Sequence, residues 1–178
     1  MNLQFVLKFT GAILIIAGSA GYGYSLAARY GQRLRELEQL RQMIFLLKGQ
    51  ITYASAPLQE AFEVVGDRTE GALSRLFGRV AGRIEAQQGE AFYRIWQEEV
   101  AGSEQDGLAM EQSDRQVLGE LGEHLGFLDK EMQERNLLLY LEQLDLRIGD
   151  LRAHKTERCR IYSSLGIMGG LFLTILLV

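Results

Sequence analysis

The chain has 178 residues, a formal net charge of −4, one cysteine and one proline. A single cysteine excludes an internal disulfide, and the roughly 130 residues between the apolar ends suffice for one domain but not for two. Residues 84–134 carry thirteen Asp and Glu against only three basic residues, which argues against nucleic acid as a ligand because its phosphates would be repelled.

Two stretches at the ends of the chain contain no charged residue at all, residues 9–28 and residues 161–178. At a helical rise of about 1.5 Å per residue, both are long enough to cross a hydrocarbon core of about 30 Å. The sequence therefore predicts transmembrane helices within residues 1–28 and at residues 161–178. A polar domain at residues 29–160 lies between them.

Basic residues flank this polar domain on both sides and predict its orientation. Arg29, Arg33 and Arg35 follow the first span, and a second group precedes the second span: Arg152, Lys155, Arg158 and Arg160. Because basic residues are retained on the cytoplasmic side, the domain is predicted to be cytoplasmic, with both chain ends across the cell membrane. The same basic residues suit anionic lipid headgroups.

A cleaved signal peptide is the competing interpretation of the first apolar stretch. Lys8, the apolar run at residues 12–17 and the small residues Gly18 and Ala20 imitate its three regions. Cleavage would export the domain and place the second basic group on the wrong side of a stop-transfer helix, against the usual charge rule.

The polar domain has helical periodicity almost throughout, so the predicted fold class is an all-α, membrane-anchored helical bundle. Two apolar seams adjoin the spans, and their spacing predicts a long antiparallel two-helix stalk that continues into the transmembrane helices. In the alternative, each seam packs on shorter helices. The first seam comprises Leu37, Leu40, Ile44, Leu47, Ile51 and Ala54; the second comprises Leu137, Leu141, Leu144, Ile148 and Leu151.

Shorter helices are predicted between the two seams. Proline is a favoured first residue of a helix, so a helix is predicted to start at Pro57, and Thr69 is a candidate cap for the next helix. Residues 101–107 are the clearest predicted loop. Ser113 and Gln116 are predicted to form a capping box, and Asp129 to cap the last helix. The inward residues are Leu58, Ala61, Phe62 and Val65, then Leu73, Leu76, Phe77, Val80 and Ile84, then Phe92, Ile95 and Trp96, then Val117, Leu121, Leu125 and Leu128.

Small residues predict close helix packing in three places. Gly166 with Gly170, and Ala17 with Gly21, are spaced by four in the apolar ends, where small side chains let helix backbones approach. The alternative is that membrane helices simply tolerate glycine. Gly119, Gly122 and Gly126 share one face of a helix in the polar domain, and their helix-propensity cost favours a tight contact there.

Arg75, Arg79 and Arg83 recur every four residues and form a basic ridge. One interpretation is that the ridge pairs with acidic residues of its own domain, such as those between Glu98 and Asp114. The other is a docking surface, which would make the ridge and the acidic pair Glu98 and Glu99 partner-binding residues.

Catalytic motifs are missing from the sequence. It contains no G-x-x-x-x-G-K-[ST] for phosphate binding, and its two histidines, His124 and His154, are thirty residues apart with no neighbouring ligand at metal-binding spacing. We expect neither catalysis nor a bound cofactor or metal.

Three segments resemble the stage III sporulation protein AB family of endospore-forming bacteria. The resemblance covers almost the whole chain and departs from the family pattern at residues 48–50, where an acidic residue is expected. The matching positions are Arg33, Leu37, Ile51, Tyr53, Pro57, Leu58, Glu60, Ala61 and Phe62; then Leu118, Gly119, Leu121, Gly122, Leu125, Gly126, Asp129 and Gln133; then residues 162–171.

The resemblance implies a non-enzymatic platform subunit of a secretion-like sporulation channel, on the mother-cell side of the forespore membrane. The family is likened to the inner-membrane platform protein of type II secretion. Its implied partners are a cytoplasmic secretion-type ATPase, stage III sporulation protein AA, and other membrane proteins of the channel. From the residues alone, a membrane-tethered regulator or sensor that binds a signalling protein or a small ligand is the alternative.

Overall fold

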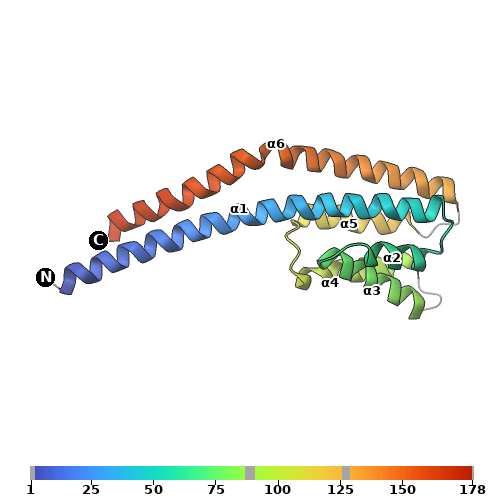
Figure 1. Cartoon of the computed structure of the whole chain (residues 1–178), viewed down its shortest axis with the longest axis horizontal. Coiled ribbons are helices and arrows are strands. Elements are labelled where there is room, and N and C mark those ends of the chain that lie inside the picture. The colour runs from blue at the N-terminus through green and yellow to red at the C-terminus, as the bar shows by residue number, and fades with distance from the viewer. Residues whose placement is uncertain (1–2, 87–90, 126–128, 178) are drawn as a thin grey trace. The chain divides into compact units, whose positions relative to one another are not determined.

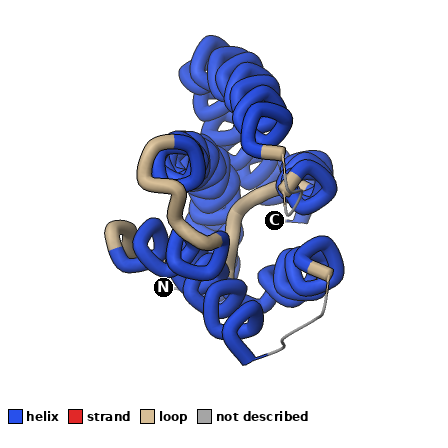
Figure 2. The backbone as a smooth tube through the Cα atoms, turned by 90° about the vertical axis from the view of Figure 1, so that its right-hand side faces the viewer, coloured by secondary structure: helices blue, strands red, loops and turns tan. Residues whose placement is uncertain are grey.

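The computed structural model describes residues 3–86, 91–125 and 129–177, and within these ranges every regular element is a helix (Figures 1 and 2). The predicted all-α class is confirmed. In chain order the elements are α1 (Leu3–Thr52), α2 (Leu58–Asp67), α3 (Ala72–Ala86), α4 (Phe92–Gly102), the short 3-10 helix η1 (Ser103–Asp106), α5 (Gln112–His124) and α6 (Lys130–Leu177).

The chain divides into two compact units, which we call the terminal unit and the central unit. The terminal unit comprises residues 1–32 and 150–178, and the central unit comprises residues 33–149. Both unit boundaries fall inside the long helices α1 and α6, whereas the sequence placed the domain boundaries after residues 28 and 160.

In the central unit, α1 and α6 are antiparallel. Arg41 pairs with Asp145 at 2.5 Å, whereas Lys48, two turns later on α1, pairs with Glu134, three turns earlier on α6, at 3.4 Å. Both predicted seams are buried between Leu37 and Ile51 and between Leu137 and Ile148. Ala54 is exposed, because α1 ends at Thr52 and the chain turns at Ser55, whose φ is +52°.

Helices α2 to α5 complete the central unit. Their apolar residues follow the predicted stripes, with Phe62, Phe77, Ile95 and Trp96 fully or almost fully buried. The ring centroids of Phe62 and Phe77 lie 4.9 Å apart, and those of Phe62 and Trp96 lie 5.6 Å apart, so aromatic contacts join α2, α3 and α4. Leu58 and Ile84 are only half-buried, and Leu128 lies outside the described residues.

Two predicted helix caps are wrong, and a third is confirmed. Thr69 does not cap α3: its hydroxyl donates to the carbonyl oxygens of Val65 and Gly66 at 3.1 and 3.2 Å, closing α2, and α3 starts only after Gly71, whose φ is +93°. The capping box is formed by Glu111 and Asp114 rather than by Ser113 and Gln116, because α5 begins at Gln112. Asp129 does cap α6, since its carboxylate accepts the backbone N–H of Glu131 at 3.0 Å.

Candidate functional site

The predicted basic ridge lies on α3 and faces acidic residues of α4 and η1. Arg79 contacts Glu99 at 2.8 Å and Asp106 at 2.7 Å, and Arg83 contacts Glu98 at 2.7 Å. Arg75 donates to the backbone carbonyl of Asp106 at 3.3 Å. The structure therefore matches the interpretation in which the ridge pairs inside its own domain, and these pairs hold α3 against α4 and η1.

The most buried charge of the central unit is the carboxylate of Asp114, whose side chain is 0% exposed. Arg33 of α1 binds both of its oxygens, at 2.6 and 3.0 Å, and Arg147 of α6 lies 3.3 Å from Oδ1. The same carboxylate accepts the backbone N–H of Glu111 at 3.0 Å, and Glu111 in turn contacts Arg33 at 2.6 Å. This buried charge cluster joins α1, α5 and α6.

Sequence reasoning did not find the buried charge cluster, although one signal of it was present. Glu111 and Asp114 have the spacing of a capping box, three residues apart before an apolar run, but carry carboxylates at both positions. Arg33 was assigned to the membrane-flanking group because of its place in the chain. In the structure its side chain is only 13% exposed, and its guanidinium binds Glu111 and Asp114 inside the bundle.

The glycines of α5 pack against α4, as predicted for Gly119 and Gly122. A Cβ atom at Gly122 would lie 2.4 Å from Cδ1 of Trp96, and one at Gly119 would lie 3.3 Å from the side-chain amide of Gln97. The two α4 side chains donate to α5 carbonyls: Trp96 Nε1 to Leu118 at 2.7 Å and Gln97 Nε2 to Gly119 at 3.0 Å. Gly126 lies outside the described residues.

Tyr140 on α6 is a buried residue whose hydroxyl has no hydrogen-bond partner among the described residues. Burial is the main cause that raises its pKa well above the usual value, and the nearby Glu120 and Asp114 raise it further. Tyr140 also lines an open hollow of about 120 Å³, together with Glu120, Asn136, Leu139 and Gln143. A second open hollow, of about 450 Å³, lies between α4 and α5 and is lined by Gln97, Val100, Ala101, Gln112, Arg115 and Gln116.

We expect Tyr140→Phe to raise the free energy of unfolding by about 1 kcal/mol, because it removes a buried hydroxyl that gains no bond on folding. The difference in the free energy of unfolding between the variant and the unsubstituted chain should grow above pH 10, the ordinary tyrosine pKa. The raised pKa of folded Tyr140 gives stability that is present below pH 10 and is lost at higher pH, as the unfolded state alone releases its proton. Urea titrations of both proteins at pH 7.5 and pH 10.5 test this. A destabilised Tyr140→Phe variant would mean that the hydroxyl has a partner.

In the terminal unit, small residues bring α1 and α6 into backbone contact. Ser19 donates its hydroxyl to the carbonyl of Gly166 at 2.5 Å. A Cβ at Gly23 would lie 2.5 Å from the carbonyl oxygen of Tyr162, and one at Gly170 would lie 3.0 Å from Cβ of Ser19. Gly166 and Gly170 therefore pack as the sequence predicted, but on Ser19 and Gly23. Gly21 has open space around it and Ala17 is exposed, so that predicted pair makes no such contact.

We expect Gly166→Val to separate the two helices of the terminal unit, because a Cβ at Gly166 would lie 2.7 Å from the backbone oxygen of Ser19. The native Cys159, whose thiol lies 3.7 Å from the carbonyl oxygen of Ala27, provides the readout. In an Ala27→Cys background, oxidation should form a disulfide with Cys159, and Gly166→Val should reduce its yield several-fold. Gly169→Val is the matched control, since its nearest neighbour is 3.7 Å away; equal yields in both variants would contradict the contact.

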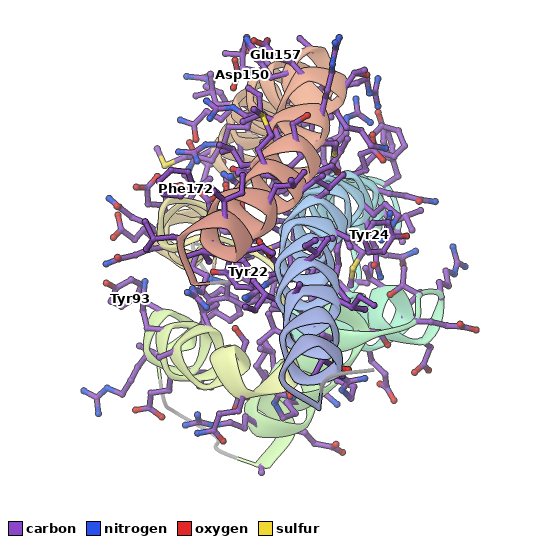
Figure 3. The ribbon with its side chains drawn as sticks, turned by 90° about the vertical axis from the view of Figure 1, so that its left-hand side faces the viewer. Tyr22, Tyr24, Tyr93, Asp150, Glu157 and Phe172 are labelled. Carbon is purple, nitrogen blue, oxygen red and sulfur yellow. The ribbon has the colours of Figure 1, made fainter. Side chains whose placement is uncertain are left out.

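Both helices of the terminal unit have the length and apolar composition to cross a membrane. In the apolar 18-residue stretch of each helix, only 6% (α1) and 11% (α6) is buried, whereas the core helix of a soluble protein is mostly buried. Tyr22, Tyr24 and Phe172 point outward from these helices (Figure 3), and all three side chains are more than half exposed. Tyrosine near the end of an apolar span is typical of the membrane–water interface.

Comparison with known proteins assigns the chain to a family. Residues 8–178 match the family model described as "Stage III sporulation protein AB (spore_III_AB)". The chain is 27% identical to "Stage III sporulation protein AB" of Bacillus subtilis (strain 168) over 173 residues, which are 97% of this chain and all of that protein.

A solved structure supports the fold. The structure titled "Stage III sporulation protein AB (SpoIIIAB)" superposes with a TM-score of 0.65 at 23% identity and covers 71% of this chain and 98% of its own. At that identity the likeness concerns the fold alone. The family model, which spans nearly every residue, decides the assignment: the chain belongs to the stage III sporulation protein AB family of sporulation proteins.

Proposed function

We propose that this sporulation protein is a non-enzymatic membrane platform, one subunit of a secretion-like channel, that anchors a cytoplasmic ATPase and couples it to the membrane assembly. The observation that carries the proposal is the hairpin that the two apolar helices form in the terminal unit. The two apolar helices contact each other through Ser19, Gly23, Gly166 and Gly170, and the central domain is the chain between them. A domain tethered at both ends has the connectivity that a platform needs.

The charged residues of the central domain support a structural rather than a catalytic role. The buried carboxylate of Asp114 is neutralised by Arg33 and Arg147, and the half-buried ridge residues Arg79 and Arg83 pair with carboxylates of α4 and η1. Within the described residues, no group of three or more His, Cys, Asp or Glu is placed to hold a metal ion. These ion pairs fix helices to one another.

The basic residues that flank the central unit support a cytoplasmic location for it. Arg29 on α1 and the group from Arg152 to Arg160 on α6 adjoin the apolar ends, where cytoplasmic retention of positive charge acts. An ATPase needs nucleotide, which the cytoplasm supplies, so the same orientation is required by the proposed partner.

Exposed apolar residues of α6 are the contact face that we propose for the ATPase. Met132, Leu139 and Leu146 recur every seven residues, so they share one side of the helix, and each is at least half exposed; Leu146 is 76% exposed. Exposed apolar side chains in a line are typical of protein contact surfaces. The ridge of α3 is a weaker candidate, because Arg79, Arg83, Glu98 and Glu99 already pair with one another.

The test is copurification of the tagged full chain from sporulating cells. We expect the ATPase, stage III sporulation protein AA, and other channel membrane proteins to be enriched. Met132→Gln, Leu139→Gln and Leu146→Gln together should abolish ATPase recovery without lowering the amount of membrane-inserted chain. The matched control replaces three exposed residues of α3 and α4: Arg75→Gln, Glu85→Gln and Tyr93→Gln.

Two outcomes would overturn parts of the proposal. Copurification of a signalling protein, with no ATPase or channel component, would favour a membrane-tethered regulator. Undiminished ATPase recovery by the α6 variant, together with loss in the α3–α4 control, would move the contact face back to the basic ridge.

A further inference from the structure

A small polar hollow opens between α5 and α6 in the central unit. It has a volume of about 120 Å³ and is lined by Glu120 of α5 and by Asn136, Leu139, Tyr140 and Gln143 of α6. Asn136, Tyr140 and Gln143 follow one another at intervals of four and three residues, so they share one face of α6. Tyr140 is only 3% exposed and forms the inner wall, whereas Leu139 and Gln143 are exposed at the rim.

The inner wall of the hollow carries a polar group that folding leaves without a bond. The hydroxyl of Tyr140 has no hydrogen-bond partner among the described residues, although a buried tyrosine hydroxyl usually finds one. Because Tyr140 is buried, a polar group that enters the hollow reaches this hydroxyl only when the exposed side chains at the rim move apart. An occupant that does so regains the stability that the unpaired hydroxyl costs the free chain.

The charge of the hollow favours a cation as its occupant. Glu120 is the one charged residue in the lining, and within the described residues no Lys or Arg is paired with it. Arg147, whose charge also acts on Tyr140, lies 3.3 Å from the carboxylate of Asp114. Residues 84–134, which include α5, carry thirteen acidic residues against three basic ones, so a positively charged group is attracted from a distance.

An ammonium group on a short alkyl chain matches the hollow in size and in chemistry. At about 30 Å³ for each water molecule in the liquid, a volume of about 120 Å³ accommodates roughly four heavy atoms, as many as lysine has from Cγ to Nζ. An ammonium has three N–H donors and no acceptor. The lining offers it a carboxylate, a hydroxyl and the oxygens of two side-chain amides.

We propose that this hollow binds the ammonium end of a lysine side chain of the protein that docks on α6. Leu139 belongs both to the hollow and to the apolar line of Met132, Leu139 and Leu146. One partner surface can therefore cover the line and insert a lysine beside it. The identity of the partner rests on the proposed function, whereas the preference of the hollow for an ammonium does not.

Titration of the detergent-solubilised full chain with n-propylammonium, followed by NMR of the side-chain amides of Asn136 and Gln143, tests the hollow without any partner. We expect saturable shifts with n-propylammonium and none with n-propanol, which has the same size and no charge. Glu120→Gln should weaken binding roughly tenfold, and Tyr140→Phe about threefold although it stabilises the free chain. Glu123→Gln removes an exposed carboxylate of α5 that does not line the hollow, so it should change binding by less than about twofold.

Carbodiimide crosslinking of the complex with the docked protein tests whether the occupant is a lysine. The reagent activates a carboxylate, which then forms an amide bond with an amine that touches it. We expect mass spectrometry of the digested complex to find Glu120 joined to a lysine of the partner, and Glu120→Gln to remove this link. Glu123→Gln should leave the link in place.

Several results would overturn the inference. If n-propylammonium gave no saturable shift, or if n-propanol bound equally well, the hollow would not be an ammonium site. Equal weakening by Glu120→Gln and Glu123→Gln would mean diffuse attraction by net charge. A partner that copurifies but is crosslinked only at other carboxylates would remove the lysine contact and leave the platform role intact. If no partner copurified, the proposed function would fail, and the n-propylammonium titration would still decide the chemistry of the hollow.

Discussion

Asp114→Ala is expected to lower the free energy of unfolding of the central domain by about 3 to 5 kcal/mol, since removing one partner of a buried ion pair leaves charge unpaired in the interior. Arg33 loses both bonds to the carboxylate, and Arg147 loses its contact at 3.3 Å. The backbone N–H of Glu111 also loses its acceptor, so the start of α5 weakens. Arg33 keeps its contact with Glu111 at 2.6 Å, which favours the lower end of the range.

Urea unfolding of the full chain in detergent, followed by fluorescence, measures this loss, because Trp96 is the one tryptophan and is buried in the central unit. Asp114→Asn keeps the shape and one acceptor oxygen and should lose less. Asp145→Asn removes an α6 carboxylate that pairs with another α1 arginine, Arg41, but both side chains are nearly half exposed, so the loss of stability should stay below about 1 kcal/mol. If Asp114→Ala and Asp145→Asn lowered the free energy of unfolding by similar amounts, the buried charge cluster would contribute no more to stability than an exposed ion pair, and the expectation would be wrong.

Gly122→Ala is expected to destabilise the central domain by about 1 to 3 kcal/mol, the usual cost of an overpacked core. The added Cβ would lie 2.4, 2.8 and 3.0 Å from three atoms of Trp96. Trp96 is fully buried among aromatic rings and is held by its bond to the carbonyl of Leu118, so it cannot turn aside without breaking that bond. The backbone of α5 must then move away from α4.

The matched control is Gly82→Ala, which is also in a helix interior. Its Cβ would meet nothing within 4 Å, so the better helix propensity of alanine should stabilise the domain by about 0.5 to 1 kcal/mol. Opposite signs for the two glycines are therefore expected. In a double-mutant cycle, Gly122→Ala should cost little further stability once Trp96 has been replaced by leucine. If the two losses in the free energy of unfolding simply add, Gly122 and Trp96 are not in direct contact.

The helices and the core were predictable from sequence because apolar spacing alone decides which face is buried. Leu37, Ile44 and Leu144 are buried as predicted, and so are Phe62 and Trp96. The caps were less predictable, since Thr69 and Ser113 can bond to backbone groups on either side of a helix boundary. Which partner each one takes depends on where the chain turns, and Gly71 and Glu111 decide that.

Of the two charged sites, one was visible in the sequence and the other was not. The ridge at Arg79 and Arg83 was visible as a spacing pattern, and pairing within the domain was one of its two interpretations. The cluster at Asp114 was not visible, because Arg33 and Arg147 lie 81 and 33 residues from it in the chain. Contacts of that range depend on how the helices pack, which periodicity does not specify.

In the terminal unit, one of the two small-residue pairs named from the sequence lies at the contact between α1 and α6, and the other does not. Gly166 and Gly170 pack closely on α1, at Ser19 and Gly23, whereas Gly21 has open space around it and Ala17 is exposed. Small residues recur so often in the first apolar stretch that several faces of it meet the small-residue pattern. The rotation of one helix against the other selects among them.

Cysteine labelling in intact protoplasts of an endospore-forming host tests most directly whether the chain is a membrane hairpin with a cytoplasmic domain. In a Cys159→Ser background, Leu146→Cys places an exposed thiol in the central domain, and Asn2→Cys places one at the amino end. With a membrane-impermeant maleimide, we expect Asn2→Cys to react at once and Leu146→Cys to react only after the membrane is opened. Immediate reaction of Leu146→Cys, or a mature chain that has lost its first apolar helix, would contradict both the topology and the platform role.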